Sequence, residues 1–285
     1  MVEQNTPQWH ELRRTKIGAS DAPIIMGVSP WKTAFQLWEE KVFGKEQETS
    51  PAMERGIALE GSARERFQDK FGILMMPKVV IHPERLWQMA SLDGISFEGT
   101  MILEIKHANR EVFEMAIQGK LPDYYMYQVQ HALDVTGAAK CYYMVCHSDR
   151  DVYVEVFPDL MMIADMRSKT SKFHEYMMSK EAPPLTDKDY VVMNDKKWEE
   201  LVKEYKDIKD QLHILLQSEE YVKDELKKLA GNRNAMGAGA KLTKSVCKGR
   251  VDYDAIPELM GVNIEPYRKA PCEKWKVSFT TKDEA

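Results

Sequence analysis

Cysteine is scarce in this 285-residue chain, and the four that occur lie far apart in sequence. Four cysteines in a chain of this length do not build a disulfide scaffold. Cys141 and Cys146 are five residues apart on one expected strand, so they face opposite sides, and no closely spaced triplet of cysteines exists. These spacings exclude an iron–sulfur cluster held by the four cysteines.

Long hydrophobic runs are also absent. No stretch approaches the roughly 18 apolar residues of a membrane span, and the N-terminus has no apolar segment like that of a signal peptide. We therefore expect a soluble, cytoplasmic protein without a membrane partner.

Positive charge is not in excess, since the net charge is −5 and the isoelectric point is about 5.9. This balance argues against a protein that coats nucleic acid without specificity. The segment of residues 226–250 is nevertheless basic and free of acids. Its positive charges are Lys227, Lys228, Arg233, Lys241, Lys244, Lys248 and Arg250. An acidic body with a local basic patch fits an enzyme that holds metal ions and contacts phosphates elsewhere.

Helical and strand patterns alternate up to a proline pair at Pro183 and Pro184. The periodicities predict helices over residues 33–42, 60–70, 124–135 and 159–179, and strands over 78–81, 87–92, 100–106, 141–146 and 151–157. Beyond the prolines, residues 195–230 predict one long charged helix, and short strands and loops follow from residue 237. We expect a domain over residues 1–182 and an appendage over residues 183–285.

The clearest pattern of candidate catalytic residues lies between Asp93 and Lys106. Glu104 and Lys106 are two residues apart on an expected strand, so both leave the same face, while Ile105 points to the other. Asp93 is expected at the end of the preceding strand, and a short hairpin through the turn-rich pairs Asp93-Gly94 and Glu98-Gly99 would bring it beside Glu104. Two converging carboxylates bind a hard cation such as Mg²⁺, and a neighbouring lysine can position or deprotonate a water.

This is the D-x(n)-E-x-K arrangement of the PD-(D/E)XK nucleases. Taken alone, the same residues also fit a surface hairpin with a Glu/Lys pair across one face. Further motifs surround the pattern in a fixed order, namely Trp9-His-Glu-Leu-Arg13, Ile17-Gly-Ala-Ser-Asp21, Ile25-Met-Gly27, Ser29-Pro-Trp31, Arg55-Gly-Ile-Ala-Leu-Glu60, Tyr124-Tyr-Met-Tyr-Gln128-Val-Gln130 and Val135-Thr-Gly137. With these motifs the chain resembles the lambda-exonuclease-like nucleases of phage recombination, also called YqaJ-type viral recombinases, over roughly residues 9–160.

The resemblance implies a role for each matching residue. Asp93, Glu104, the backbone carbonyl of Ile105 and Glu60 would ligate Mg²⁺, for which Mn²⁺ can substitute. Lys106 would be the catalytic lysine, and Gln128 the active-site glutamine that contacts the water or the lysine. The residues that would hold the DNA terminus are Arg13 and Ser20. A guanidinium fork suits a 5′-phosphate, and a serine hydroxyl adds a donor.

The resemblance also implies an α/β fold with a mixed central sheet flanked by helices, extended here by the C-terminal helical appendage. The implied activity is digestion of double-stranded DNA from a 5′ end in the cytoplasm of a bacterial host, by a phage or prophage protein. Its partners would be a single-strand annealing protein and further copies of itself in a ring. Two alternatives stay open, an endonuclease of the same superfamily and a non-catalytic scaffold that binds DNA ends.

Overall fold

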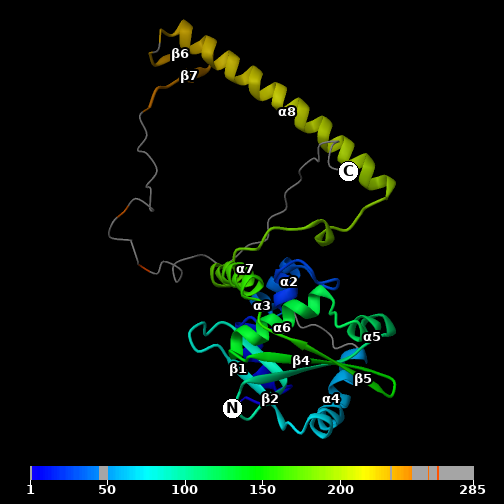
Figure 1. The fold of residues 1–285 in the computed structure, drawn as a ribbon. Coiled ribbons are helices and arrows are strands. Elements are labelled where there is room, and N and C mark those ends of the chain that lie inside the picture. Colours follow the sequence, from blue (N-terminus) through cyan, green and yellow to red (C-terminus); the bar gives the residue numbers. More distant parts are fainter. Residues whose placement is uncertain (1, 45–50, 232, 246–255, 257–261, 263–285) are drawn as a thin grey trace. The chain divides into compact units, whose positions relative to one another are not determined.

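The computed structural model describes residues 2–44, 51–231, 233–245, 256 and 262 of the chain (Figure 1). These residues form two compact units, Met1–Tyr190 and Val191–Ala285. No helix among the described residues is long and apolar enough to cross a membrane.

The first unit is built on a five-stranded mixed sheet, as expected from the resemblance. Its strands lie in the order β1 (Met75–Ile81), β2 (Met89–Ser96), β3 (Met101–His107), β4 (Lys140–His147) and β5 (Arg150–Val156). β3 and β4 are parallel, whereas the other neighbouring pairs are antiparallel. A parallel pair needs a long crossover, which here consists of α5 (Arg110–Ile117) and α6 (Asp123–Thr136).

Helices cover both faces of this sheet, so β4, which lies between β3 and β5, is buried on both sides. On one face α4 (Pro51–Phe71) contributes two buried side chains, Ala63 and Phe67, to a hydrophobic cluster. The strand residues of this cluster include Leu103, Ile105 and Met144. On the other face α5 and α6 pack on a larger cluster, which includes Val112, Val129, Leu133, Ile102, Tyr143 and Val145. Cys141 belongs to this cluster and Cys146 to the α4 side, as their spacing predicts.

Four further helices complete the unit: α1 (Pro7–Thr15), α2 (Ala22–Ile25), α3 (Ala34–Phe43) and α7 (Leu160–Ser179). The segment after α1 is fastened to the start of β2, because the Ile17 amide donates to the Trp87 carbonyl at 2.8 Å and the Met89 amide donates to Ile17 at 2.9 Å. α1 therefore lies beside the strand that carries Asp93.

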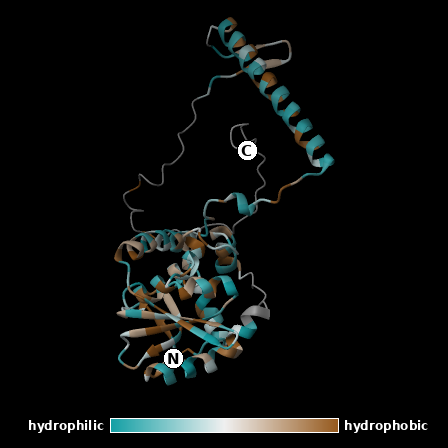
Figure 2. Ribbon diagram, turned by 45° about the vertical axis from the view of Figure 1, so that its right-hand side comes forward, coloured by the Kyte–Doolittle hydropathy of each residue, from teal (hydrophilic) through white to brown (hydrophobic). Residues whose placement is uncertain are grey.

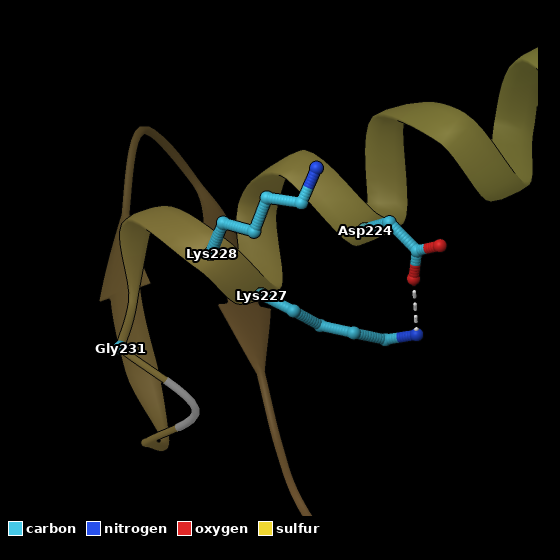
Figure 3. Close-up of a pocket in the computed structure, with 4 residues that line it drawn as sticks. All are labelled: Asp224, Lys227, Lys228 and Gly231. Atoms are coloured by element: carbon cyan, nitrogen blue, oxygen red, sulfur yellow. Dashed lines mark hydrogen bonds and ion pairs between the residues drawn. The ribbon is translucent and has the colours of Figure 1, made fainter.

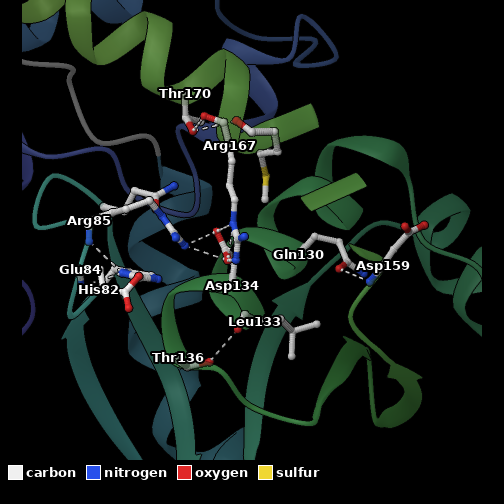
Figure 4. A network of polar contacts seen from close by, with 12 residues as sticks. His82, Glu84, Arg85, Gln130, Leu133, Asp134, Thr136, Asp159, Arg167 and Thr170 are labelled. Atoms are coloured by element: carbon white, nitrogen blue, oxygen red, sulfur yellow. Dashed lines mark hydrogen bonds and ion pairs between the residues drawn. The ribbon is translucent and has the colours of Figure 1, made fainter. Parts of the chain in front are cut away.

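A buried carboxylate holds α6 in place (Figure 4). Both oxygens of Asp134 accept hydrogen bonds at 2.9 Å from Arg85, which precedes β2, and both also accept from Arg167 of α7. A buried charge is tolerated when it is fully paired in this way. The pairing anchors the helix that carries Gln128.

The predicted turn at Asp93 and Gly94 was wrong. Both residues lie inside β2, and the chain reverses at residues 97–100, so the turn predicted at Glu98-Gly99 is confirmed, with a φ of +74° at Gly99. Gly94 is required for close approach, since a Cβ there would stand 2.8 Å from the Met75 Cβ and 3.2 Å from the Leu103 Cβ. The glycine thus serves the packing of β2 between β1 and β3.

The second unit begins with α8 (Lys196–Leu229), the long helix that its sequence predicts, capped by the Asp195 side chain. A short hairpin of β6 (Ala235–Gly237) and β7 (Ala240–Leu242) follows. The expected strands beyond it, including residues 275–279, lie outside the described residues, as do Cys247 and Cys272. The functional division at residue 182 stays a prediction.

Candidate active site

The ladder between β2 and β3 gives way at the candidate site. The two strands pair at Gly94 with Leu103 and at Ile95 with Ile102. One residue further on, the Asp93 carboxylate accepts the Ile105 amide at 2.7 Å and so takes the place of a backbone carbonyl. Because of this hydrogen bond, the Asp93 carboxylate points toward β3 and contacts the residue that follows Glu104.

Glu104 contacts two other predicted residues of the site. It is buried, and its Oε1 lies 2.6 Å from the Lys106 Nζ and 2.5 Å from the Gln128 Nε2. The spacing of two along β3 sets the first contact, and α6 supplies the second. Gln128 was expected to contact a water or the lysine, and in the structure it donates to the glutamate.

Glu60 reaches the same region from α4. Its carboxylate accepts from Arg64 Nη1 at 3.1 Å, and the same nitrogen donates to the Asp93 carbonyl at 2.8 Å. Arg64 was not among the predicted site residues, although a glutamate and an arginine four residues apart on a helix are a recognisable pair. Arg64 ties the helix acid to the strand acid.

The charges of these groups are coupled. Burial, followed by the charges of Glu104 and Glu60, raises the pKa of Asp93 well above its ordinary value. The pKa of Glu60 is also raised, first by burial and then by Glu104, against the opposing effect of Arg64. Burial alone would lower the pKa of Lys106, but Glu104 and Asp93 outweigh it and raise that pKa. The site therefore concentrates negative charge around one protonated lysine.

Hard oxygen donors in a region of excess negative charge fit a divalent cation. Among the described residues, no group of three or more His, Cys, Asp and Glu side chains forms a complete metal cage. Mg²⁺ does not need one, because it is commonly held by one or two carboxylates with several waters. Asp93 and Glu104 are the predicted pair of ligands, and their role stays a prediction, as do the contributions of Glu60 and of the Ile105 carbonyl.

Arg13 and Ser20, predicted as a pair, are in contact. The Arg13 Nη2 donates to the Ser20 Oγ at 2.9 Å, and the guanidinium lies over the Trp9 ring, 4.8 Å from its centroid. The Trp9 indole N–H donates to the Ser91 Oγ at 2.8 Å, on the strand that carries Asp93 two residues later. A chain of direct contacts thus connects the arginine to β2.

A buried lysine that the sequence analysis missed supports this pair. The Lys41 Nζ lies 2.6 Å from the Asp21 Oδ2 and donates to the carbonyls of Arg13 at 2.7 Å and Lys16 at 2.9 Å. Asp21 stands at the N-cap position of α2 without capping it, since its side chain accepts from the Gly18 amide instead. The lysine of α3 holds the end of α1 against the loop of Ser20.

We expect Lys41→Met to destabilise the fold by about 3–5 kcal/mol, because the buried Asp21 carboxylate loses its closest cation. Urea unfolding measures the loss. Lys172→Met is the matched control, since Lys172 pairs with Glu175 on the surface and its replacement should leave stability nearly unchanged. Equal stability of both variants would contradict the role given to Lys41.

An aromatic row leads to the lysine of the site. Trp31 is 69% exposed and meets the Tyr124 ring edge-on at 4.9 Å between centroids. Tyr124 meets Tyr125 at 4.5 Å, and the Lys106 Nζ lies 5.1 Å from the Tyr125 centroid. Ring faces of this kind can stack on nucleic-acid bases without sequence preference.

In the basic segment of residues 226–250, which begins in the last turn of α8, two lysines form ion pairs with acids of the helix. At the end of the helix, Lys227 lies 2.8 Å from Asp224, and these two residues with Lys228 and Gly231 line a pocket (Figure 3). Lys228 pairs with Glu225 at 2.6 Å. Among the described residues, Arg233, Lys241 and Lys244 form no ion pair, and Lys248 and Arg250 lie outside the described range. Contact with DNA by this segment stays a prediction.

Comparison with known proteins supports the motif resemblance. Residues 8–139 match the YqaJ-like viral recombinase domain. The uncharacterized protein YqaJ of Bacillus subtilis (strain 168) is 30% identical over 192 residues, which cover 64% of this chain and 60% of that protein. A protein of African swine fever virus is 22% identical over 163 residues, or 46% of each chain. The chain thus spans about half to three fifths of the length of these relatives.

The chain also matches a solved structure. The crystal structure of an alkaline exonuclease, LHK-Exo from Laribacter hongkongensis, aligns with a TM-score of 0.55 and 24% identity, over 61% of this chain and 94% of that one. This likeness supports the fold, a mixed sheet flanked by helices. The family resemblance drawn from the ordered motifs is confirmed.

Proposed function

We propose that this protein is a Mg²⁺-dependent deoxyribonuclease that digests double-stranded DNA from a 5′ end. Its product would be a 3′ single strand for an annealing protein in phage-type recombination. The observation that carries the proposal is the convergence of Asp93, Glu104, Lys106 and Gln128 at the open end of the β2–β3 pair. The YqaJ-like domain match and the exonuclease fold support it.

Each side chain has a distinct task in this proposal. Bound Mg²⁺ would act as a Lewis acid that offsets charge developing on the scissile phosphate. Lys106, held protonated by its acidic neighbours, orients the attacking water and adds positive charge near the phosphate. Gln128 fixes the rotamer of Glu104, and the Ile105 amide fixes that of Asp93. The carboxylates thereby need little rearrangement when the reaction begins.

Arg13 and Ser20 would receive the terminal phosphate. The Arg13 side chain is about one third exposed, so it can turn donors toward a ligand while Trp9 supports its face. Mostly exposed Trp31 offers a ring to bases near the site. These features favour action at an end over internal cleavage, because a pocket for a terminal phosphate serves only at an end.

We expect Arg13→Ala to slow digestion of 5′-phosphorylated duplexes by roughly tenfold or more, with a smaller effect on 5′-hydroxyl ends. Initial rates on the two kinds of end measure the difference. Arg14→Ala is the matched control, because Arg14 is engaged with Glu11 on the surface and should leave both rates unchanged. Equal loss on both kinds of end would assign Arg13 a general structural role.

The activity itself is tested with linear and covalently closed circular duplexes in the presence of Mg²⁺. We expect release of nucleotides from the 5′-labelled linear duplex and no product from the closed circle. Cutting of the circle would indicate an endonuclease. Binding to linear ends without any cleavage would indicate a non-catalytic scaffold. Mass measurements and pull-down of a co-encoded annealing protein address the proposed ring and partner.

A further inference from the structure

α8 carries a row of exposed apolar residues. In Figure 2 the apolar positions of this helix are coloured brown along an otherwise teal ribbon. None of the residues of this 34-residue helix is buried. The apolar row alternates steps of three and four residues, and its members are Trp198, Leu201, Tyr205, Ile208, Leu212, Leu215, Val222, Leu226 and Leu229. The only charged residue at a position of this series, which we call the seam, is Glu219.

The seam keeps its three–four spacing without a slip from Trp198 to Leu229. That spacing has a period of 3.5 residues, whereas a straight helix turns every 3.6. A period of 3.5 keeps the apolar face in contact with another helix of the same period in a left-handed supercoil. The pattern therefore indicates a helix as the partner, rather than a flat surface.

We propose that the seam is covered by α8 of a second copy of this chain, running antiparallel. In the register that brings Leu212 opposite Leu215 of the second copy, every seam position of one helix meets a seam position of the other. Nine seam side chains on each helix, each losing roughly 60–100 Å² of exposed surface, would bury roughly 1,100–1,800 Å². This area reaches the range of stable protein interfaces. The inference goes beyond the proposed nuclease function and does not depend on it.

The charge of Glu219 on the seam favours the antiparallel direction. In this register Glu219 lies opposite Ile208 of the second copy, next to Lys209 of that copy. Within the described part of the chain, Glu219 and Lys209 form no ion pair, although five lysine–acid contacts form elsewhere on the helix. The pairing occurs twice by symmetry. A parallel pair would instead place Glu219 against its own copy, which costs stability.

Side-chain size and the basic segment favour the same direction. The two large aromatic residues of the seam, Trp198 and Tyr205, lie opposite the smaller Leu229 and Val222 of the second copy, and large-against-small layers pack well. The acid-free segment that begins at Leu226 comes to opposite ends of the pair. At about 1.5 Å per residue, a 34-residue helix separates these like charges by roughly 50 Å.

The first test measures the mass of the full chain in solution by light scattering. We expect wild type to have an even multiple of 33.0 kDa, and Leu212→Lys with Leu215→Lys to halve that mass. The factor of two holds whether or not the nuclease units also assemble into a ring. Ile214→Lys with Tyr221→Lys is the matched control, since these apolar residues are also exposed but lie off the seam. This control should keep the wild-type mass.

An unchanged mass in the seam variant would overturn the proposal. Monomeric wild type at micromolar concentration would do the same, and would indicate that the seam is covered by the chain's own nuclease unit or by a different protein. A second test covers the case in which the lysine variant misfolds. Glu219→Lys alone should weaken the dimer, and adding Lys209→Glu should restore it. In a parallel pair, the glutamate introduced by Lys209→Glu would meet Glu204 of the second copy, so absence of restoration would refute the antiparallel arrangement.

Discussion

Replacing Lys106 by methionine or Glu104 by glutamine is expected to lower the rate of DNA cleavage by at least about 10²–10³-fold. Both variants should remain folded, because the lysine side chain is partly exposed and the glutamine keeps the shape of the glutamate. The effect should appear in kcat, since these groups act on the reacting atoms more than on bound DNA. Single-turnover cleavage of a labelled linear duplex, with circular dichroism on each variant, measures it.

A neighbouring ion pair provides the matched control. Lys140 and Glu155 lie 2.5 Å apart on the adjacent strands β4 and β5, away from Asp93 and Gln128. Lys140→Met and Glu155→Gln remove the same chemical groups and should cleave at the wild-type rate. If either active-site variant retained activity within tenfold of wild type, the site would have to lie elsewhere.

Asp93→Asn is expected to abolish cleavage and, at the same time, to stabilise the protein. The asparagine oxygen can still accept the Ile105 amide, while the charge that burial, Glu104 and Glu60 disfavour is removed. Active sites commonly lower the stability of the folded protein, and a single substitution that removes such a destabilising feature commonly stabilises it by about 0.5–2 kcal/mol. For a protein of this size that corresponds to a rise in Tm of roughly 2–6 °C.

The raised pKa of Asp93 also predicts how its contribution to stability changes with pH. The pKa of Asp93 is higher in the folded protein than its ordinary 3.8, so the folded state binds more protons than the unfolded state above pH 3.8. The contribution of Asp93 to stability therefore falls as the pH rises from 3.8 through the raised pKa. Urea unfolding of wild type and Asp93→Asn at several pH values should therefore show the advantage of Asp93→Asn growing as the pH rises.

Asp151→Asn serves as a control of opposite sign. Asp151 accepts two hydrogen bonds from Arg66, and the pKa of Asp151 is lowered chiefly by that arginine. Its replacement should lower stability slightly. Asp93→Asn that proved less stable than wild type at neutral pH would contradict the electrostatic description of the site.

Most of the sheet could be predicted from local pattern. β3 follows from a run of apolar residues that leads into Glu104-Ile105-Lys106, and the spacing of two fixes which side chains share a face. The mixed order of the strands followed from the family resemblance. Asp93 was correctly placed beside Glu104, although its strand was wrongly ended there. An Asp-Gly pair is the usual sign of a turn, and here the crowding by Met75 and Leu103 explains the glycine instead.

Contacts between segments distant in sequence could not be predicted in the same way. Lys41 reads as an ordinary charged residue of an amphipathic helix, and only the fold brings it to Asp21 and to the last carbonyls of α1. Gln128 depends on the anchoring of α6 by Asp134, which needs arginines from two other elements. The heptad spacing of α8 is visible in the sequence, but its exposure is a result of the structure.

Metal binding in the absence of DNA tests the site most directly, because it separates the carboxylates from every other requirement of cleavage. Mn²⁺ added to the protein loses its free-ion electron paramagnetic resonance signal when it binds, and Mg²⁺ should displace it. We expect wild type and Glu155→Gln to bind Mn²⁺ equally, and Glu104→Gln and Asp93→Asn to bind it at least roughly tenfold more weakly. Binding by Glu104→Gln and Asp93→Asn as strong as that of wild type would show that these carboxylates do not hold the metal.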